Sequence, residues 1–328
     1  KQAQSSKGGA SMSFSSKVKN EIAKIDDEKS CCQIAELSAL IKMNGTIQIL
    51  GRNKIGIKLT TENAAIARRI FSLIKNNFDI QTRVSMTKNK QLKKNYSYTL
   101  LVDSDGASEN ILKKLSIMNE TAGGYKINYK IPAAIIKNDC CKKAYLRGVF
   151  LGGGSISDPE KTYHLELVTS NEIYAEDIKN LINCFGLNAK IVSRKSNFVI
   201  YLKEGENIVD FLNIIGAHSA LLDLENVRIY KEMRNNVNRI VNCETANLSK
   251  TVNAAMRQIN NIKYIKESMG LNKLPKNLRD IAEARLLYQD ASLKELGETI
   301  NPPVGKSGVN HRLRKLDELA DKLRERKF

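Results

Sequence analysis

The feature that most constrains the fold is a nine-residue pattern that occurs twice. Residues 37–45 read LSALIKMNG, and residues 146–154 read LRGVFLGGG. Each segment is typical of an apolar helix with small residues on one side, which let two helices approach closely. Each also reaches a glycine that can end a helix. The pattern therefore predicts two equivalent helices that pack against each other in a duplicated domain.

The duplication continues beyond these helices. Residues 57–63 and 165–171 alternate in the period of a strand and then reach a Ser/Thr/Asn cluster suited to a helix N-terminus. Both copies continue with an amphipathic helix, two more strands and a short helix. A lone half would leave a sheet face uncovered. We therefore expect an α+β fold in which two αββαββα halves, residues 12–118 and 133–220, pack with pseudo-twofold symmetry.

The repeated helices resemble the LAGLIDADG motif of homing endonucleases, in which two such helices pack at the pseudo-twofold axis of a saddle. In that family the acidic eighth residue of each copy holds a divalent metal over the DNA backbone. The eighth residues here are Asn44 and Gly153. Because Mg²⁺ prefers charged oxygen ligands, we expect no catalytic residues and no enzyme activity. The alternative is a residual metal-dependent DNA nicking enzyme, in which Asp158 or Glu160 would act from a rearranged loop.

The charge and hydropathy of the chain favour a nucleic-acid partner. The formal net charge is +18, and basic side chains on a phosphate backbone release condensed counterions. No uncharged apolar run approaches the roughly 20 residues of a membrane helix. We expect a cytoplasmic, nucleoid-associated protein with double-stranded DNA and no membrane as partner. Residues 1–11 are polar and lack the apolar core of a secretory signal, and we interpret them as a tag remnant before a start at Met12.

The candidate metal ligands are six cysteines and three histidines. Four of the cysteines form the adjacent pairs Cys31 with Cys32 and Cys140 with Cys141. Adjacent cysteines do not match the C-x2-C spacing that lets two thiolates share one zinc ion, and the histidines are scattered. Both pairs fall shortly before a repeated helix, which is a further sign of duplication. We expect no metal and no cofactor, and we interpret the cysteines as reduced and buried.

Two basic segments are candidate phosphate contacts. The first is a strand hairpin within residues 80–102, which contain no acid. The second is a helical linker over residues 221–274, with basic residues beside a loose apolar stripe. Either surface is solvated or lies on DNA. The basic residues are Arg83, Lys88, Lys90, Lys93, Lys94, Arg228, Lys231, Arg234 and Arg239.

Residues 275–328 predict an all-α helix-turn-helix domain. Ser292 and Glu295 form a capping box for a short helix over residues 293–300, and a last helix begins near Ser307. Its apolar stripe consists of Val309, Leu313, Leu316, Ala320 and Leu323. On the other side, arginine and asparagine suit contacts with guanine and adenine. The candidate DNA-binding residues are Lys306, Ser307, Asn310, His311, Arg312, Arg314 and Lys315. A solvated face on a helical hairpin is the alternative.

Longer phrases of the sequence are similar to those of the WhiA family. They are MSFSSKVK at 12–19, AYLRG at 144–148, YHLE at 163–166, RNNVNR at 234–239, NCETAN at 242–247 and KSGVNHRL at 306–313. The resemblance covers essentially all of residues 12–328. It implies a bacterial DNA-binding regulator with a degenerate LAGLIDADG domain, in which loss of the motif acids is usual, and a C-terminal helix-turn-helix.

The resemblance also implies a biological setting. The family is a sporulation transcription factor in actinomycetes and is linked to cell division and chromosome segregation in low-GC Gram-positive bacteria. The Lys- and Asn-rich composition fits the second setting. We therefore expect a sequence-specific transcriptional regulator without nuclease activity. Its duplicated domain supplies phosphate contacts or docks RNA polymerase or a partner regulator, so an adaptor for the transcription or division machinery is a further alternative.

Overall fold

The computed structural model describes residues 12–26, 29–51, 54–88, 96–102, 106–121 and 124–325. The chain forms two compact units, with the boundary between Tyr230 and Lys231. The expected tag remnant lies outside the described residues, as do the candidate phosphate contacts Lys90, Lys93 and Lys94.

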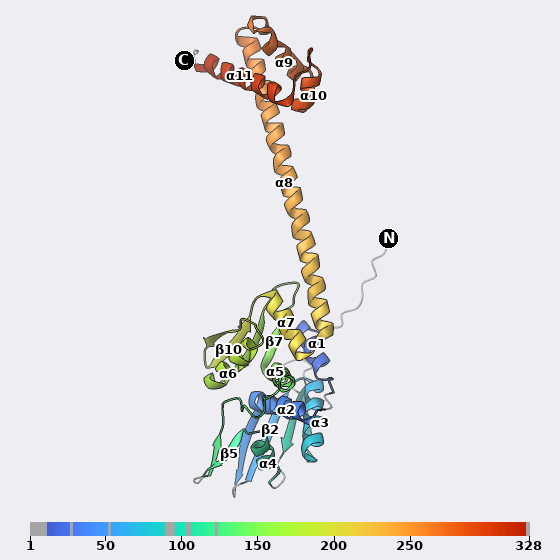
Figure 1. The fold of residues 1–328 in the computed structure, drawn as a ribbon, viewed down its shortest axis with the longest axis vertical. Helices are drawn as coiled ribbons and strands as arrows, with labels where there is room; N and C mark the ends of the chain where they lie inside the picture. Colours follow the sequence, from blue (N-terminus) through green and yellow to red (C-terminus); the bar gives the residue numbers. More distant parts are fainter. Residues whose placement is uncertain are drawn as a thin grey trace, which may run out of the picture. The chain divides into compact units, whose positions relative to one another are not determined.

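The first unit contains two repeats with the expected αββαββα order. The first repeat consists of α2 (Ser30–Asn44), β1 (Gly45–Gly51), β2 (Lys54–Thr61), α3 (Ala64–Phe78), β3 (Arg83–Lys88), β4 (Tyr96–Val102) and α4 (Ala107–Lys114). The second consists of α5 (Asp139–Gly153), β7 (Gly154–Ile156), β8 (Leu165–Thr169), α6 (Glu172–Asn183), β9 (Lys190–Arg194), β10 (Asn197–Leu202) and α7 (Gly205–Ile215). Figure 1 shows the repeats meeting at α2 and α5, so the predicted fold class is confirmed.

Apart from the start of α8 (His218–Ser268), three elements of this unit have no counterpart in the repeat pattern. Helix α1 (Phe14–Ile22) precedes the first repeat, and a hairpin of β5 (Met118–Thr121) and β6 (Gly124–Ile127) follows it. Helix α1 buries Val18 and Ile22 in the common core. These elements occur once in the described chain, so no periodicity marked them.

The two sheets have the same topology. Their antiparallel strand orders are β1-β2-β4-β3 and β7-β8-β10-β9. Leu59 lies opposite Leu100 in the first sheet, and Leu167 lies opposite Ile200 in the second. All four side chains are buried. Because side chains alternate between faces, each sheet has one face in the core and one open face.

Equivalent asparagines start the helices that follow β2 and β8. The Asn63 side chain accepts hydrogen bonds from the amides of Ala65 and Ile66, at 2.8 and 3.3 Å. The Asn171 side chain accepts from the Tyr174 amide at 2.9 Å. Each satisfies a first-turn N–H that no helical carbonyl reaches, so the predicted helix starts are confirmed.

Helices α2 and α5 approach each other at Gly148. A Cβ at this position would lie 2.4 Å from the Glu36 carbonyl oxygen and 2.8 Å from the Ala39 Cβ. Any larger residue would have to push the helices apart. The prediction that small residues allow close packing of the repeated helices is therefore confirmed.

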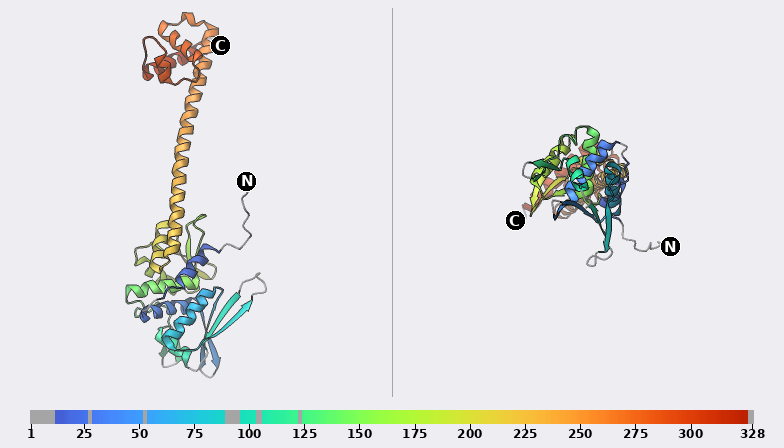
Figure 2. Two further views of the ribbon diagram at one scale, coloured as in Figure 1. Left: turned by 90° about the vertical axis from the view of Figure 1, so that its right-hand side faces the viewer. Right: turned by 90° about the horizontal axis from the view of Figure 1, so that it is seen from below.

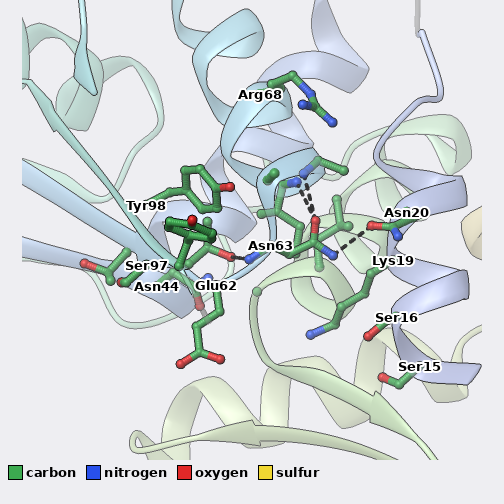
Figure 3. A pocket seen from close by; sticks show the side chains of 18 of the residues that line it. Ser15, Ser16, Lys19, Asn20, Asn44, Glu62, Asn63, Arg68, Ser97 and Tyr98 are labelled. Carbon is green, nitrogen blue, oxygen red and sulfur yellow. Dashed lines mark hydrogen bonds between the residues drawn. The ribbon is translucent and has the colours of Figure 1, made fainter. Parts of the chain in front are cut away.

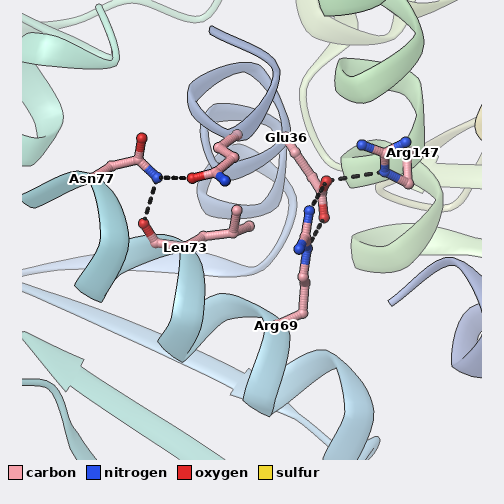
Figure 4. Close-up of polar contacts among 6 residues, drawn as sticks. Glu36, Arg69, Leu73, Asn77 and Arg147 are labelled. Atoms are coloured by element: carbon pink, nitrogen blue, oxygen red, sulfur yellow. Dashed lines mark hydrogen bonds and ion pairs between the residues drawn. The ribbon is translucent and has the colours of Figure 1, made fainter. Parts of the chain in front are cut away.

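A buried ion pair network joins three helices beside this contact (Figure 4). Glu36 on α2 is 0% exposed, and its carboxylate accepts from Arg69 Nε and Nη2 on α3 at 2.8 and 2.9 Å. Arg147 Nε on α5 donates to the same carboxylate at 3.0 Å. Burial raises the pKa of Glu36, and the hydrogen bonds from Arg69 counter that rise. The network links the two repeats through their first helices.

The second unit is entirely helical in its described part. Its elements are the C-terminal part of α8 (His218–Ser268), a 3-10 helix at Leu271–Lys273, α9 (Lys276–Leu287), α10 (Leu293–Glu298) and α11 (Lys306–Glu325). The capping box of Ser292 and Glu295 is present. Helix α10 ends two residues earlier than expected, with Thr299 as its C-cap. The limits of the linker over residues 221–274 stay a prediction, since the unit boundary falls inside α8.

The core of the second unit forms around the apolar stripe of α11. Val309, Leu313, Leu316 and Ala320 are buried against Ile262, Ile265, Ile281 and Leu296 from the other helices, and Leu323 is partly buried there. The prediction that these residues form the inward-facing apolar stripe of the last helix is therefore confirmed. No helix in the described ranges is both long and apolar enough to cross a membrane.

Candidate nucleic-acid interface

The face of α11 opposite its buried stripe is polar and open to solvent. Six of the seven candidate residues are exposed: Lys306, Ser307, Asn310, His311, Arg314 and Lys315. Arg312 is half-buried, and its Nη1 donates to the Asn277 carbonyl on α9 at 3.4 Å. Arg312 therefore contacts the unit's own backbone, whereas the other six point away from the core.

Polar contacts hold the opposite end of α11 to α8. Asn261 Nδ2 donates to Asp317 at 2.7 Å, and Arg324 Nη2 donates to the Asn261 side-chain oxygen at 2.6 Å. The Arg324 guanidinium also lies 5.0 Å from the centre of the Tyr264 ring. Within the described residues, no ion pair or side-chain hydrogen bond engages Asn310, His311 or Arg314. The helix is thus fixed at one end and presents donors and acceptors at the other.

The positions that carry acids in homing endonucleases are built differently here. A Cβ at Gly153 would lie 2.1 Å from Met43 Cε and 2.7 Å from the Val168 carbonyl oxygen. The space that a side chain at Gly153 would need is therefore already occupied. The Asn44 carboxamide lies 2.7 Å from the Gly152 carbonyl when its NH₂ group is oriented to donate. A carboxylate at either position would meet a filled space or a carbonyl oxygen.

Asp158 and Glu160 lie in the turn that follows β7. Asp158 Oδ1 accepts a hydrogen bond from the Glu160 amide at 3.1 Å, so this carboxylate helps to shape its own turn. In the described part of the chain, neither acid belongs to a group of three or more side chains with metal-ligand geometry.

A pocket of about 1000 Å³ opens beside the C-terminal ends of α2 and α5 (Figure 3). Its polar lining includes Ser15, Ser16, Lys19, Asn20, Lys24, Asn44, Glu62, Asn63, Arg68, Ser97 and Tyr98. Three of these are cations, and one is a carboxylate. Burial lowers the pKa of Lys19. Cations, hydroxyls and amides suit an anionic group better than a metal ion.

The open faces of the two sheets differ in charge. Strand pairing places Lys58, Thr60, Thr99, Arg83 and Ser85 together on the first sheet. This face is rich in hydroxyls and cations, and its edge strand β3 is exposed along its whole length. Figure 2 shows the β3–β4 ribbon extending from the body of the unit.

The second sheet carries an acid at the equivalent place. Glu166 accepts from Arg194 Nη1 at 2.8 Å and lies 2.7 Å from His164 Nε2. The surrounding donors counter the effect of burial and lower the pKa of Glu166. Lys190 and Arg194 share this face with Glu166, so the acid lowers the positive charge of the second sheet relative to the first without reversing it.

The basic residues of α8 are not equivalent. Arg228 forms ion pairs with Glu225 at 2.9 Å and Glu206 at 3.7 Å. Arg234 and Arg239 are exposed, and Lys231 is half-buried. Arg228 is therefore committed to its own unit, while Arg234 and Arg239 remain candidates for phosphate contacts.

The structure also brings together residues that local spacing kept apart. The four-cysteine cluster consists of Cys31, Cys32, Cys140 and Cys141, whose sulfur atoms all lie within 4.8 Å of one another. The pairs are the second and third residues of α2 and α5, inside the repeated helices rather than before them. The missed signal was their equal position in the two repeats, because helices related by a pseudo-twofold axis place equivalent residues side by side.

The thiols of this cluster differ in environment. Cys32 and Cys141 are buried, Cys140 is half-buried and Cys31 is exposed. Burial raises the pKa of Cys32, and it raises the pKa of Cys141 to about 11. A hydrogen bond with Cys32 lowers the pKa of Cys140. Burial thus makes the two inner thiols harder to deprotonate than an exposed thiol.

Comparison with known families agrees with this architecture. Three family models match the chain: the WhiA N-terminal LAGLIDADG-like domain at residues 30–118, the WhiA LAGLIDADG-like domain at 142–234 and the WhiA C-terminal HTH domain at 237–320. The helix-turn-helix model thus covers residues 237–320 of the second unit.

Individual relatives cover nearly the full length. The protein named "Probable cell division protein WhiA" from Alkaliphilus metalliredigens is 61% identical over 95% of this chain and 99% of its own. The protein of that name from Clostridium botulinum is 57% identical over 96% and 99%. The crystal structure of full-length DUF199/WhiA from Thermatoga maritima is 28% identical, with a TM-score of 0.57 over 95% of this chain and 99% of that one. The chain therefore belongs to the WhiA family.

Proposed function

We propose that the chain is a transcriptional regulator that recognises specific DNA sequences through the N-terminal half of α11 and does not cut DNA. The observation that carries the proposal is the exposed polar face of the N-terminal half of α11, which has no acid from Lys306 to Lys315, on a well-packed helical unit. The relatives bear the name of a cell division protein, which supports a role in cell division, and we extend the proposal to chromosome segregation.

The recognition chemistry follows from the positions on the helix. Asn310 and Arg314 are four residues apart and so lie on one face, with His311 beside them. Asparagine pairs with adenine and arginine with guanine in the major groove, where a recognition helix inserts its N-terminal residues. Lys306, Ser307 and Lys315 flank that face and would contact phosphates. Arg312 would mainly position α11 against α9.

The duplicated domain would add contacts with the DNA backbone. The open face of the first sheet, which carries Lys58 and Arg83, and the cationic pocket beside Asn44 both suit phosphate. Lys88 lies on the other face of the exposed edge strand β3, because it is five residues from Arg83. The open face of the second sheet carries Glu166 and is better suited to a protein partner, such as RNA polymerase or a partner regulator. DNA would thus approach the first repeat and protein the second.

The absence of cleavage is part of the proposal. Metal-assisted hydrolysis of a phosphodiester needs carboxylates near the scissile phosphate. Asn44 and Gly153 supply none, and Met43 fills the space beside Gly153. Supercoiled plasmid incubated with Mg²⁺ or Mn²⁺ should therefore stay intact. Nicking that disappears in Asp158→Asn or Glu160→Gln would instead make the chain a nicking enzyme.

The decisive test of sequence-specific DNA recognition compares two matched variants on the same helix. Arg314→Ala should weaken binding to the preferred site by roughly 1–3 kcal/mol and relax the preference at one base position. Lys322→Ala removes the same charge from the exposed C-terminal end of α11 and should leave the preference unchanged. Selection of bound fragments from genomic DNA, followed by sequencing, measures both.

Two results would contradict this reading. An equal loss for every sequence in Arg314→Ala would make this residue a phosphate contact. A cell division phenotype that survives deletion of residues 275–328 would assign the function to the duplicated domain, acting as an adaptor for the transcription or division machinery.

A further inference from the structure

We propose that the four-cysteine cluster binds one zinc ion and joins the two repeats at the N-terminal ends of α2 and α5. The sulfur atoms already lie within 4.8 Å of one another. A tetrahedral zinc ion with Zn–S bonds of about 2.3 Å places its sulfurs about 3.8 Å apart, and the Cys140 and Cys141 sulfurs are 4.0 Å apart. Side-chain rotations that move the sulfurs by about an ångström would bring them to this tetrahedral spacing.

The ligand type selects the metal. Four thiolates are soft ligands in the set used by structural zinc sites, whereas magnesium and calcium require oxygen. An iron–sulfur cluster is several atoms across and would hold the cysteines farther apart than a single ion does. A disulfide would need two sulfurs at about 2.05 Å and an oxidant. The observed spacing therefore fits one tetrahedral ion, and zinc is the ion that structural four-thiolate sites hold.

The helix ends partly offset the cost of burying the negative charge of a four-thiolate site. Neither α2 nor α5 has a side-chain hydrogen bond at its N-cap, in contrast to α3 and α6. The first-turn N–H groups of two helices thus offer partial positive charge to the thiolates. Lys29 adds a cation next to Cys140. Zinc binding would release the four thiol protons to solvent, and exposed Cys31 gives the ion a route in.

The location gives the ion a structural role. The cluster takes one cysteine pair from each repeat, so its metal would bridge two halves that are far apart in sequence. It lies at the opposite helix ends from Asn44 and Gly153. The ion would stabilise the packing of α2 against α5 and would take no part in phosphodiester chemistry.

The test uses the full chain purified with a reductant, loaded with zinc and desalted. Mass spectrometry of metals should find about one zinc ion per chain, as expected for a four-thiolate site. Cys32→Ser and Cys31→Ser should weaken zinc binding by more than the ~10–100-fold that losing an outer-shell partner costs. Cys184→Ser is the matched control, because this exposed thiol lies outside the cluster, and should retain the ion.

Cobalt gives a second measurement that needs no variant. Co²⁺ bound by the wild-type chain should show thiolate charge-transfer bands and the intense visible bands of a tetrahedral ion. The proposal is overturned if the folded wild type retains no zinc and shows no such cobalt spectrum. It is also overturned if mass spectrometry after alkylation finds a disulfide within the cluster of the reduced, zinc-loaded protein. DNA binding by α11 is measured separately and would survive either result.

Discussion

The two ends of the α2–α5 pair carry different chemistry although one repeated pattern builds both helices. At the C-terminal ends, Asn44 and Gly153 stand where homing endonucleases place metal-binding acids, and the space is filled by Met43 and by carbonyl contacts. At the N-terminal ends, four sulfur atoms converge. The difference teaches that one repeated pattern can leave one end of a helix pair without acids while it gathers four sulfur atoms at the other.

Glu36 lies between the two ends of the helix pair. Its removal should lower the stability of the pair more than any other proposed change, because it disturbs both ends. Glu36→Ala leaves the buried Arg69 and Arg147 guanidiniums without their carboxylate, which should cost about 3–5 kcal/mol. Native-state hydrogen exchange of α2 and α5 amides reports this unit alone. Glu120→Ala is the control, because its partner Lys113 and Glu120 itself are 40% and 68% exposed, and its loss should cost under about 1 kcal/mol. Equal effects would mean that the network does not hold the helix pair.

Zinc should stabilise the same helices from their N-terminal ends. At a free zinc concentration 100 times the dissociation constant, linkage adds about 2.7 kcal/mol to the free energy of unfolding. Hydrogen exchange of the first-turn amides, with zinc and then with a chelator, measures the change. Cys184→Ser should respond as the wild type does, and Cys32→Ser should not respond. A chelator effect that persists in Cys32→Ser would place the ion elsewhere.

Lys42 allows a smaller, pH-dependent test near the C-terminal end of α2. Its Nζ donates to the Asn128 carbonyl at 2.9 Å and to that of Lys130, and burial lowers its pKa from 10.5 to about 8. Because the unfolded chain binds the proton more tightly, stability should rise as pH increases from about 8 to 10.5. With solvent screening, the gain is about 1 kcal/mol relative to Lys42→Met. Urea unfolding of both proteins across this range measures it, and parallel curves would contradict the burial effect.

Restoring acids at the C-terminal ends should have the smallest functional effect. Asn44→Asp combined with Gly153→Asp recreates the acidic eighth residues, but the second aspartate meets Met43 and the Val168 carbonyl. We expect no metal-dependent nicking of supercoiled plasmid. A triple variant that adds Met43→Ala opens the space and is the sharper comparison. Nicking by the double variant alone would show that acids were the only feature lost.

Local patterns predicted much of this molecule. The αββαββα order, the helix-starting asparagines and the buried stripe of α11 follow from spacing, because helix and strand periods fix which side chains share a face. Features without a repeat partner, such as α1 and the β5–β6 hairpin, were missed for the same reason. The partial burial of Arg312 against Asn277 was also missed, because it depends on where α9 lies.

The sequence by itself determined that two equivalent helices exist, that each has a cysteine pair nearby and that each ends without an acid. Only the tertiary structure decided which side chains meet at each end of the helix pair. The equal position of the cysteine pairs in the two repeats pointed to their convergence, but a distance between sulfur atoms more than a hundred residues apart in sequence required the packing of α2 on α5. Likewise, the sequence shows only that Gly153 lacks a ligand side chain. The structure shows that Met43 occupies the space that such a side chain would need. Packing set the chemistry of both ends, because sulfur ligation and steric exclusion depend on distances of a few ångströms.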